Sequence, residues 1–438
     1  MSIELITLLL FTALIVTLAL GLPLVFTLAG IAIVFSLLLW GPKSLYVIPS
    51  VTTSMVFKIM LIAIPLFVFM ASVLERAGIA EELYNMMHHW FGPIRGGLAA
   101  GTVVICTIFA AMSGVTAAGT VTMGIVALPN MLKRGYDKKI AIGCIMAGGA
   151  LGQLIPPSVI LIIYGMLAEQ SVGRLFLGGV IPGLILSTLF ITYILVRSFF
   201  NPSLGPPLPP EECADWGQKF ASLRAVILPA MLVVGVLGSI FAGVATPTEA
   251  AAVGALGSLI CAGIHRKLSW QLVRDACLRT IRVTAMIVWI MMAAKMFVTV
   301  YQGIGAPHLV QHALAGIPGG KWMILAAMQL SFFVLGCFMD PTGTIMITGP
   351  VYLPLANSLG FDPIWFGILF AVNIEMGYLT PPFGTNLFYM KGIAPKGITM
   401  ADIYRSIVPF VGLQAIGLLL VIFFPPLALW LPNMVFNR

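Results

Sequence analysis

Long apolar stretches alternate with short polar connections along the whole chain. A membrane-spanning helix requires about twenty apolar residues, and most of these stretches reach or approach that length. The pattern predicts spans at residues 4–20, 22–39, 59–74, 175–196, 225–241, 246–264, 283–300 and 406–429, and interrupted spans at 140–164 and 364–390. Two further segments, 41–58 and 265–282, are typical of arms that lie at a membrane surface.

Two segments are too long for one helix and too polar in the middle for a span. Residues 97–132 contain apolar legs, 98–111 and 121–132, around a polar tip at 112–120. At 1.5 Å per residue, a leg of about a dozen residues cannot cross a hydrocarbon core of about 30 Å. We therefore predict a re-entrant hairpin, which enters and leaves the membrane on one side. Residues 322–358 predict a second one.

The segment 64–164 recurs at 289–389 with a constant displacement of 225 positions. Gly78 falls on Gly303, the Leu128-Pro129 pair falls on 353–354, and the Pro156-Pro157 pair falls on 381–382. The matched residues are mostly glycines and prolines, which interrupt helices. Helix breaks in corresponding places of two membrane halves are the best indication in a sequence of a transporter's binding site.

The positive charges indicate how the two halves are oriented. The connection after the first hairpin carries four lysines and arginines between Lys133 and Lys139, whereas its repeat partner, 357–363, carries only Asp362. The arm 265–282 is basic, and its counterpart holds only Lys43. Because cytoplasmic connections are enriched in positive charge, the halves are predicted to be inverted. We expect an all-α polytopic membrane protein made of two inverted repeats.

Each repeat is predicted to hold five spans and one hairpin. The first covers residues 1–200 and the second 225–438, and a proline-rich linker at 201–224 joins them on the cytoplasmic side. Both termini would then lie outside the cytoplasm. Because the first forty residues carry one charge, Glu4, and no basic segment, we expect no cleaved signal peptide.

Composition narrows the class of function. Sixty per cent of the residues are hydrophobic and nine per cent are charged, which is typical of a chain whose solvent is lipid. The six cysteines have no metal-ligand spacing, so we expect them to bind no metal and to form no disulfides, and the net charge of +8 lies in connections and arms, so no nucleic-acid partner is expected. Phosphate-binding and hydrolase motifs are absent, so we expect neither an enzyme nor an organic cofactor.

The hairpin tips and the breaks opposite them carry the candidate chemistry. Breaking a helix inside a membrane frees carbonyl oxygens that need partners, and an oxygen-binding cation is one such partner. The first tip, 113–116, faces the break 152–158, and the second tip, 340–344, faces the break 377–386. Two related clusters predict two sodium-like sites with the substrate between them. The N-terminal ends of the broken helices favour an anionic substrate. The alternative is that these glycines and prolines only permit close helix packing.

Acidic residues inside the apolar segments are few, which makes them informative. Asp340, at the second tip, is our strongest candidate for a cation ligand or gate, with a helix cap as the alternative. Glu375 could reach a hairpin residue, either in a structural ion pair or in transport. Glu249 is expected to cap or pack a helix.

Six segments carry specific motifs, and they are spread over essentially the whole chain: 109–114, 127–136, 152–158, 246–251, 336–340 and 377–384. These motifs resemble one family, the large membrane subunit (M-type) of the tripartite ATP-independent periplasmic (TRAP) transporters. One departure is Val115, which stands where family members often have a small polar residue.

The resemblance implies an elevator-type ion-transporter fold and coupling to a sodium gradient. A moving domain would carry both hairpins against a scaffold of outer spans (4–39 and 225–264) and arms. It also implies a small four-helix membrane subunit, here expected as a separate polypeptide, and a periplasmic binding protein that delivers carboxylates, commonly dicarboxylates or sugar acids. We therefore predict a multi-pass protein in the lipid of the bacterial inner membrane that imports an organic anion.

The site residues are assigned in three sets. One sodium would be held by Ser113, Gly114, Gly152, Ile155 and Pro156, and the other by Asp340, Thr342, Gly377 and Thr380. Candidates for substrate contact are Thr116, Ser158, Thr385 and Asn386. Two alternatives stay open. The chain could act alone, as a sodium/dicarboxylate symporter without a binding protein, or it could be a channel or scaffold without coupled transport.

Overall fold

An apolar chain in lipid must satisfy its backbone N–H and C=O groups internally, and helices do so within one segment. The computed structural model of the protein describes residues 2–114, 116–309 and 318–436. Every regular element in those ranges is a helix, so the expected all-α class is confirmed. Val115, at the first tip, lies outside the described residues.

The first half contains ten α-helices and three short 3-10 helices among the described residues. They are α1 (Ile3–Ala19), α2 (Leu24–Trp40), η1 (Pro42–Tyr46), α3 (Val47–Val56), η2 (Ile59–Ile62), α4 (Ala63–Arg76), α5 (Ile79–Phe91), α6 (Gly97–Ser113), α7 (Thr116–Lys133), α8 (Lys138–Ala150), η3 (Leu151–Gln153), α9 (Val159–Ala168) and α10 (Val172–Phe200).

The linker and the second half contain two short 3-10 helices and ten α-helices among the described residues. They are η4 (Pro202–Leu204), η5 (Pro210–Glu212), α11 (Trp216–Ser222), α12 (Arg224–Phe241), α13 (Pro247–Ile264), α14 (Trp270–Gly303), α16 (Gly320–Phe338), α17 (Pro341–Ser358), α18 (Pro363–Leu379), α19 (Thr385–Ile393), α20 (Met400–Phe423) and α21 (Pro426–Phe436). Helix α17 begins and ends 225 residues after α7, which is the displacement of the sequence repeat.

Polar caps fix where several helices begin, because a side-chain oxygen there accepts a backbone N–H that has no partner in the helix. Asp137 caps α8 and Asp362 caps α18. Thr246 and Glu249 form a reciprocal capping box at α13, in which Glu249 accepts the Thr246 N–H at 2.8 Å. The capping role expected for Glu249 is confirmed.

The turn of the first hairpin is shorter than the polar tip that we predicted. That tip covered residues 112–120, but α6 continues to Ser113 and α7 begins at Thr116. Gly114 makes this sharp turn possible because its φ of 61° lies in the left-handed region. The legs therefore contain 17 and 18 residues.

The second arm is also different from its prediction. Residues 265–282 and 283–300 were expected to be an arm and a separate span, but α14 runs through both as one helix of 34 residues. In the first half the corresponding chain is interrupted at Lys58, whose backbone is extended. No proline or glycine stands between residues 270 and 302 to break α14.

Seven helical stretches among the described residues are long and apolar enough to cross a membrane. Six of them cover predicted spans. The seventh, α16, was predicted as a hairpin leg. The spans predicted at 4–20 and 22–39 form shorter apolar helices, α1 and α2. Whether the hairpins are re-entrant remains a prediction.

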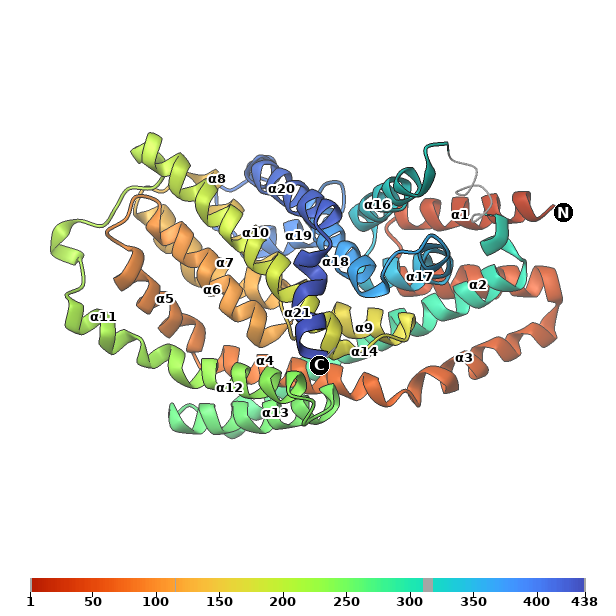
Figure 1. Ribbon diagram of the computed structural model, residues 1–438, viewed down its shortest axis with the longest axis horizontal. Helices are drawn as coiled ribbons and strands as arrows, with labels where there is room; N and C mark the ends of the chain where they lie inside the picture. The colour runs from red at the N-terminus through yellow and green to blue at the C-terminus, as the bar shows by residue number, and fades with distance from the viewer. Residues whose placement is uncertain (1, 115, 310–317, 437–438) are drawn as a thin grey trace.

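The broken helices lie in the middle of the molecule. In Figure 1, α18 and α19 lie near the centre, whereas α1, α2 and α3 lie at the right and α11 and α12 at the left and lower edge. All of α18 from Ile364 to Leu379 is buried. Its contact with α16 is close: a Cβ built on Gly377 would lie 2.8 Å from the Gly336 backbone.

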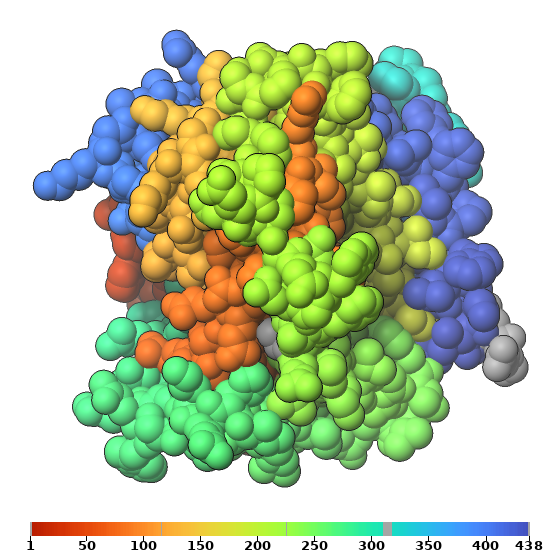
Figure 2. Space-filling model, turned by 90° about the vertical axis from the view of Figure 1, so that its left-hand side faces the viewer, coloured from red at the N-terminus to blue at the C-terminus, as the bar shows by residue number. Residues whose placement is uncertain are grey.

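The linker packs against the first half through aromatic side chains. Trp90 of α5 donates a hydrogen bond to the Lys219 carbonyl at 3.1 Å, and its ring meets Trp216 and Phe220 edge-on. Figure 2 shows this yellow-green segment lying beside α5, in orange, on one face of the molecule. The linker is therefore an ordered part of this surface.

We expect Gly377→Ala to lower the free energy of unfolding by about 1–3 kcal/mol, because the new methyl group would overlap the Gly336 backbone. Thermal unfolding of the purified protein in detergent measures the effect. Gly412→Ala in α20 is the matched control, since nothing lies within 4 Å of its Cβ position. Equal unfolding temperatures for the two variants would contradict the close contact.

Candidate functional site

The first hairpin tip and the first break touch each other. A Cβ on Gly114 would lie 2.2 Å from the Pro157 carbonyl oxygen, so only glycine fits there. The Val159 N–H lies 3.4 Å from the Gly114 carbonyl oxygen. Ser113 is also buried. The structure therefore brings Ser113 and Gly114 to the break that the sequence predicted they would face.

The same hairpin leg and break carry three buried oxygens that have no hydrogen-bond partner among the described residues: Gln153 Oε1, Thr116 Oγ1 and Thr120 Oγ1. The 3-10 turn η3, which contains Gly152 and Gln153, packs against α6 and α7. Buried polar oxygens usually have partners, so this concentration is unusual. These atoms are available to bind a cation or a polar ligand.

The remaining residues of the first break point elsewhere. The Ser158 hydroxyl donates to the Gln153 carbonyl and accepts the Leu161 N–H at 3.3 Å, so it caps α9. Ile155 lies against α10, where a Cβ on Gly183 would come within 2.5 Å of its side chain. The peptide between Pro156 and Pro157 is cis. Ile155 thus contributes its backbone, and not its side chain, to any site at the tip.

At the second tip, Asp340 caps α17. Its carboxylate accepts the Thr342 N–H at 2.9 Å and the Gly343 N–H at 3.4 Å. Asp340 is partly buried, whereas Thr342 is buried. The capping role, which was the alternative for this residue, is therefore present. A carboxylate with two amide contacts keeps lone pairs that are free to bind a cation.

The second break is attached to the end of α16. The Phe383 N–H donates to the Cys337 carbonyl at 3.1 Å, and Gly377 lies against Gly336. The Thr380 hydroxyl donates to the Met376 carbonyl of its own helix at 2.6 Å. Gly377 and Thr380 therefore lie close to the second tip, but the contacts to the tip run through backbone atoms of α16.

Asn386 connects the second break to the first half. Its Nδ2 donates to the Met146 carbonyl of α8 at 3.0 Å, and its Oδ1 is buried without a partner among the described residues. The adjacent Thr385 interacts with the Tyr378 hydroxyl, which is also near Asp340. Helix α19 begins at Thr385 without a side-chain cap. Its first N–H groups can therefore bind an anion.

Glu375 does not reach a hairpin residue. This fully buried side chain lies 3.4 Å from Gln414 Nε2 of α20, and none of the ion pairs found in the described chain includes it. The sequence contains one indication of this contact: Gln414 is an isolated polar residue in an apolar span.

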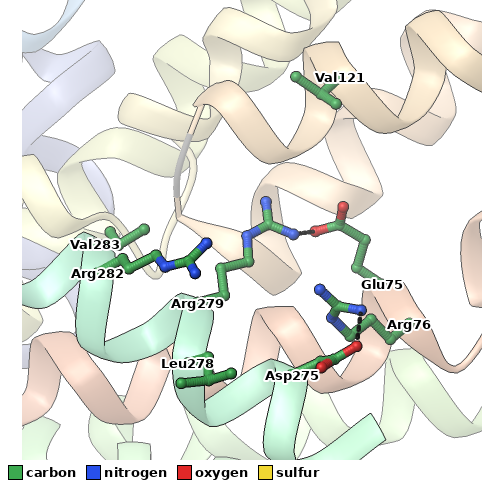
Figure 3. A pocket seen from close by; sticks show the side chains of 8 residues that line it. All are labelled: Glu75, Arg76, Val121, Asp275, Leu278, Arg279, Arg282 and Val283. Carbon is green, nitrogen blue, oxygen red and sulfur yellow. Dashed lines mark hydrogen bonds and ion pairs between the residues drawn. The ribbon is translucent and has the colours of Figure 1, made fainter. Parts of the chain in front are cut away.

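A second polar cluster, which we did not predict as a site, joins the first hairpin to the second arm. Glu75, at the end of α4, accepts a hydrogen bond from the Thr122 hydroxyl of α7 at 2.9 Å and forms an ion pair with Arg279 of α14. Arg76 pairs with Asp275 at 3.1 Å. Both ion pairs lie at a cavity of about 510 Å³. Figure 3 shows the residues that line it: Glu75, Arg76, Val121, Asp275, Leu278, Arg279, Arg282 and Val283.

Comparison with known proteins identifies the family. The family model of the DctM component of the tripartite ATP-independent periplasmic transporter matches residues 11–427. This chain is a member of the TRAP transporter family. The C4-dicarboxylate TRAP transporter large permease protein DctM of Pseudomonas aeruginosa is 33% identical over 374 residues, which are 85% of this chain and 86% of that protein.

Another TRAP relative is the ectoine/5-hydroxyectoine large permease protein UehC of Ruegeria pomeroyi, which is 32% identical over 98% of this chain and 99% of its own length. The solved structures of the YdaH transporter of Alcanivorax borkumensis and of MtrF of Neisseria gonorrhoeae are similar in fold, with TM-scores of 0.61 and 0.58. They are 14% and 12% identical to this chain. They cover 92% and 89% of it, and the matches cover 98% and 84% of those chains.

The predicted family is therefore confirmed. The chain is the large permease of a TRAP system, a multi-pass membrane component of a secondary transporter that works with a periplasmic binding protein. Its relatives are permease subunits and not enzymes.

Two substitutions of Asp340 distinguish the loss of its hydrogen-bond acceptor from the loss of its charge. We expect Asp340→Ala to lower the free energy of unfolding by about 0.5–2 kcal/mol, because the Thr342 and Gly343 N–H groups lose their acceptor, whereas Asp340→Asn keeps an acceptor and costs less. Asp362, which caps α18 in the same way, provides the matched pair Asp362→Ala and Asp362→Asn. Thermal unfolding measures all four. Equal losses for Asp340→Asn and Asp340→Ala would show that capping is not what Asp340 contributes to stability.

Proposed function

We propose that this TRAP permease imports an organic anion across the bacterial inner membrane together with sodium ions. The observation that carries the proposal is the contact of the first hairpin tip with a broken helix, on two segments that hold three buried oxygens without a partner among the described residues. Buried polar atoms of this kind are costly unless a ligand satisfies them. Na⁺ is a hard cation that prefers oxygen ligands, so the donor set suits it.

We place one sodium site at each hairpin tip, together with the break that the tip faces. Ser113, Gly114 and the segment Gly152–Pro156 form the first, where backbone carbonyls and hydroxyls supply the oxygens. Asp340 and Thr342, with Gly377 and Thr380 of the facing break, form the second. Asp340 supplies its negative charge, and its cap of α17 holds the carboxylate in place. Because the Thr380 hydroxyl donates to its own helix, one of its lone pairs remains available.

The substrate is proposed to lie between these sites. Thr385 and Asn386 stand at the uncapped start of α19, where backbone N–H groups favour a carboxylate. Thr116 contributes a hydroxyl from the first tip. Ser158 is a weaker candidate, since its hydroxyl is engaged within the break. We propose a dicarboxylate or a sugar acid as the substrate, and the C4-dicarboxylate transporter of Pseudomonas aeruginosa, a relative of this chain, supports the class.

We propose an elevator movement for the transport step. The hairpins and broken helices would form a moving body, and α1–α4 with α12–α14 would form the scaffold. A small four-helix membrane subunit would extend the scaffold, and a periplasmic binding protein would deliver the anion. The cavity between α4, α14 and α7, where the Thr122 hydroxyl meets Glu75, supports a division between these two bodies.

Uptake into proteoliposomes tests the proposal. The vesicles would hold this permease and its small subunit, with labelled succinate and the binding protein outside, under an inward sodium gradient or an equal potassium gradient. We expect uptake only with sodium and the binding protein. Asp340→Asn and Ser113→Ala are expected to reduce it at least tenfold, since each removes an oxygen ligand or its charge. Asp362→Asn, a cap outside the site, is expected to leave it unchanged.

Other results would point elsewhere. Sodium-driven uptake without the binding protein would favour a stand-alone symporter. If uptake ran equally in potassium, sodium coupling would be refuted. If no labelled acid enters, the sodium dependence of thermal stability shows whether the protein binds sodium, because a ligand that binds the folded state stabilises it. If sodium stabilises the wild type but not Asp340→Asn, the proposed sodium sites would stand, and only succinate would be excluded as the substrate.

A further inference from the structure

One carboxylate joins three helices at the second arm. The two oxygens of Glu75 have different partners: Oε1 accepts from the Thr122 hydroxyl of α7, and Oε2 pairs with Arg279 of α14. Figure 3 shows Glu75 and Arg279 pointing toward each other across the cavity. Glu75 is mostly shielded, with 16% of its side chain exposed. Hydrogen bonds to a charged, shielded group are among the stronger ones in proteins.

The contact lies on the boundary between the two bodies that the elevator proposal defines. Glu75 and Arg279 belong to α4 and α14 of the scaffold, whereas Thr122 belongs to the hairpin that would move. Thr122 is six residues after Thr116, or about 9 Å along α7 from the first tip. Because the basic arm is predicted to be cytoplasmic, this contact holds the tip near the cytoplasmic side.

The repeat offers no equivalent contact on the opposite side. Adding or removing the displacement of 225 places Glu75 on Val300, Thr122 on Ile347 and Arg279 on Ser54. Those three residues cannot form a carboxylate-centred cluster. An inverted repeat would otherwise provide matching contacts in the two end states of the movement. The repeat therefore supplies no symmetry-related copy of this cluster for the other end state.

We propose that Glu75 is a positioning residue that latches the first hairpin to the scaffold in the inward-facing state of the transporter. This inference rests on the elevator movement of the proposed function. Glu75 holds the moving helix through Thr122, and the ion pair with Arg279 orients the carboxylate. The contact must break each time the hairpin leaves the cytoplasmic side. Glu75 therefore sets the ratio of the two states without touching substrate or sodium.

Single-molecule fluorescence in lipid vesicles tests the latch. Dyes on cysteines that replace Lys133, at the exposed end of α7, and Lys267, which is exposed and stands just before α14, report the movement. Cys213 and Cys277, the cysteines that are not buried, would be replaced by serine. We expect Thr122→Val to shift the ratio of states about tenfold away from the inward-facing one, because this near-isosteric change removes only the hydroxyl. Glu75→Gln is expected to shift it in the same direction.

Asp275→Asn is the matched control, since it alters an ion pair of the same cavity that lies wholly within the scaffold. We expect it to leave the ratio of states unchanged. If two conformational populations are present but Thr122→Val and Glu75→Gln do not change their ratio, the latch would be refuted and the elevator would stand. A single population in the wild type and in every variant, with and without sodium, would overturn the elevator and the latch together.

A cross-link provides an independent check. In the double variant Glu75→Cys and Thr122→Cys, we expect mercury to join the two thiols and to stop sodium-driven uptake, with recovery after a reducing thiol is added. The pair Arg76→Cys and Asp275→Cys, which joins two scaffold helices, is expected to cross-link without loss of uptake. Uninterrupted uptake by a fully cross-linked Glu75–Thr122 pair would show that this interface does not move.

Discussion

The fold depends on how its helix breaks are satisfied, because no water in the hydrocarbon core can replace a lost backbone hydrogen bond. At the first break, Ser158 serves as both donor and acceptor. At the second, the Phe383 N–H returns to the Cys337 carbonyl of α16. Protein groups therefore compensate for part of each break, whereas Gln153 Oε1, at the first break, is a buried side-chain oxygen without a partner among the described residues. In the proposed function, a cation would take the place of that missing partner.

Glycine and proline made the breaks predictable. Their effect on the backbone is local, so the positions of Gly114, Pro156 and Pro381 could be interpreted without tertiary structure. The same local signals explain the errors. A turn at Gly114 needs fewer residues than the polar composition of 112–120 indicated, and nothing in the sequence of α14 marks a boundary between arm and span. Polarity located the unusual segments, but it did not fix their length.

The partners of the site residues were less predictable than the residues themselves. Asn386 was identified from its place in a break, yet its contact with Met146 joins positions 240 residues apart. Gln153 stood inside a motif that we had singled out, but its unpaired oxygen depends on the packing of η3 against both hairpin legs. Local pattern therefore identifies candidate ligands, whereas long-range packing decides which of their atoms are free to bind.

The Glu75 cluster shows why an inverted repeat needs asymmetric contacts. Two related halves with identical contacts would give the end states of an elevator similar energies, and only the ligands would choose between them. A hydrogen bond to a charged carboxylate contributes about 1.5–3 kcal/mol, which is enough to change such a ratio by tenfold or more. In the proposed elevator, the equivalent positions Val300, Ile347 and Ser54 cannot supply the same energy to the other end state. The proposed latch would therefore bias the orientation of the permease through side chains outside its proposed binding site.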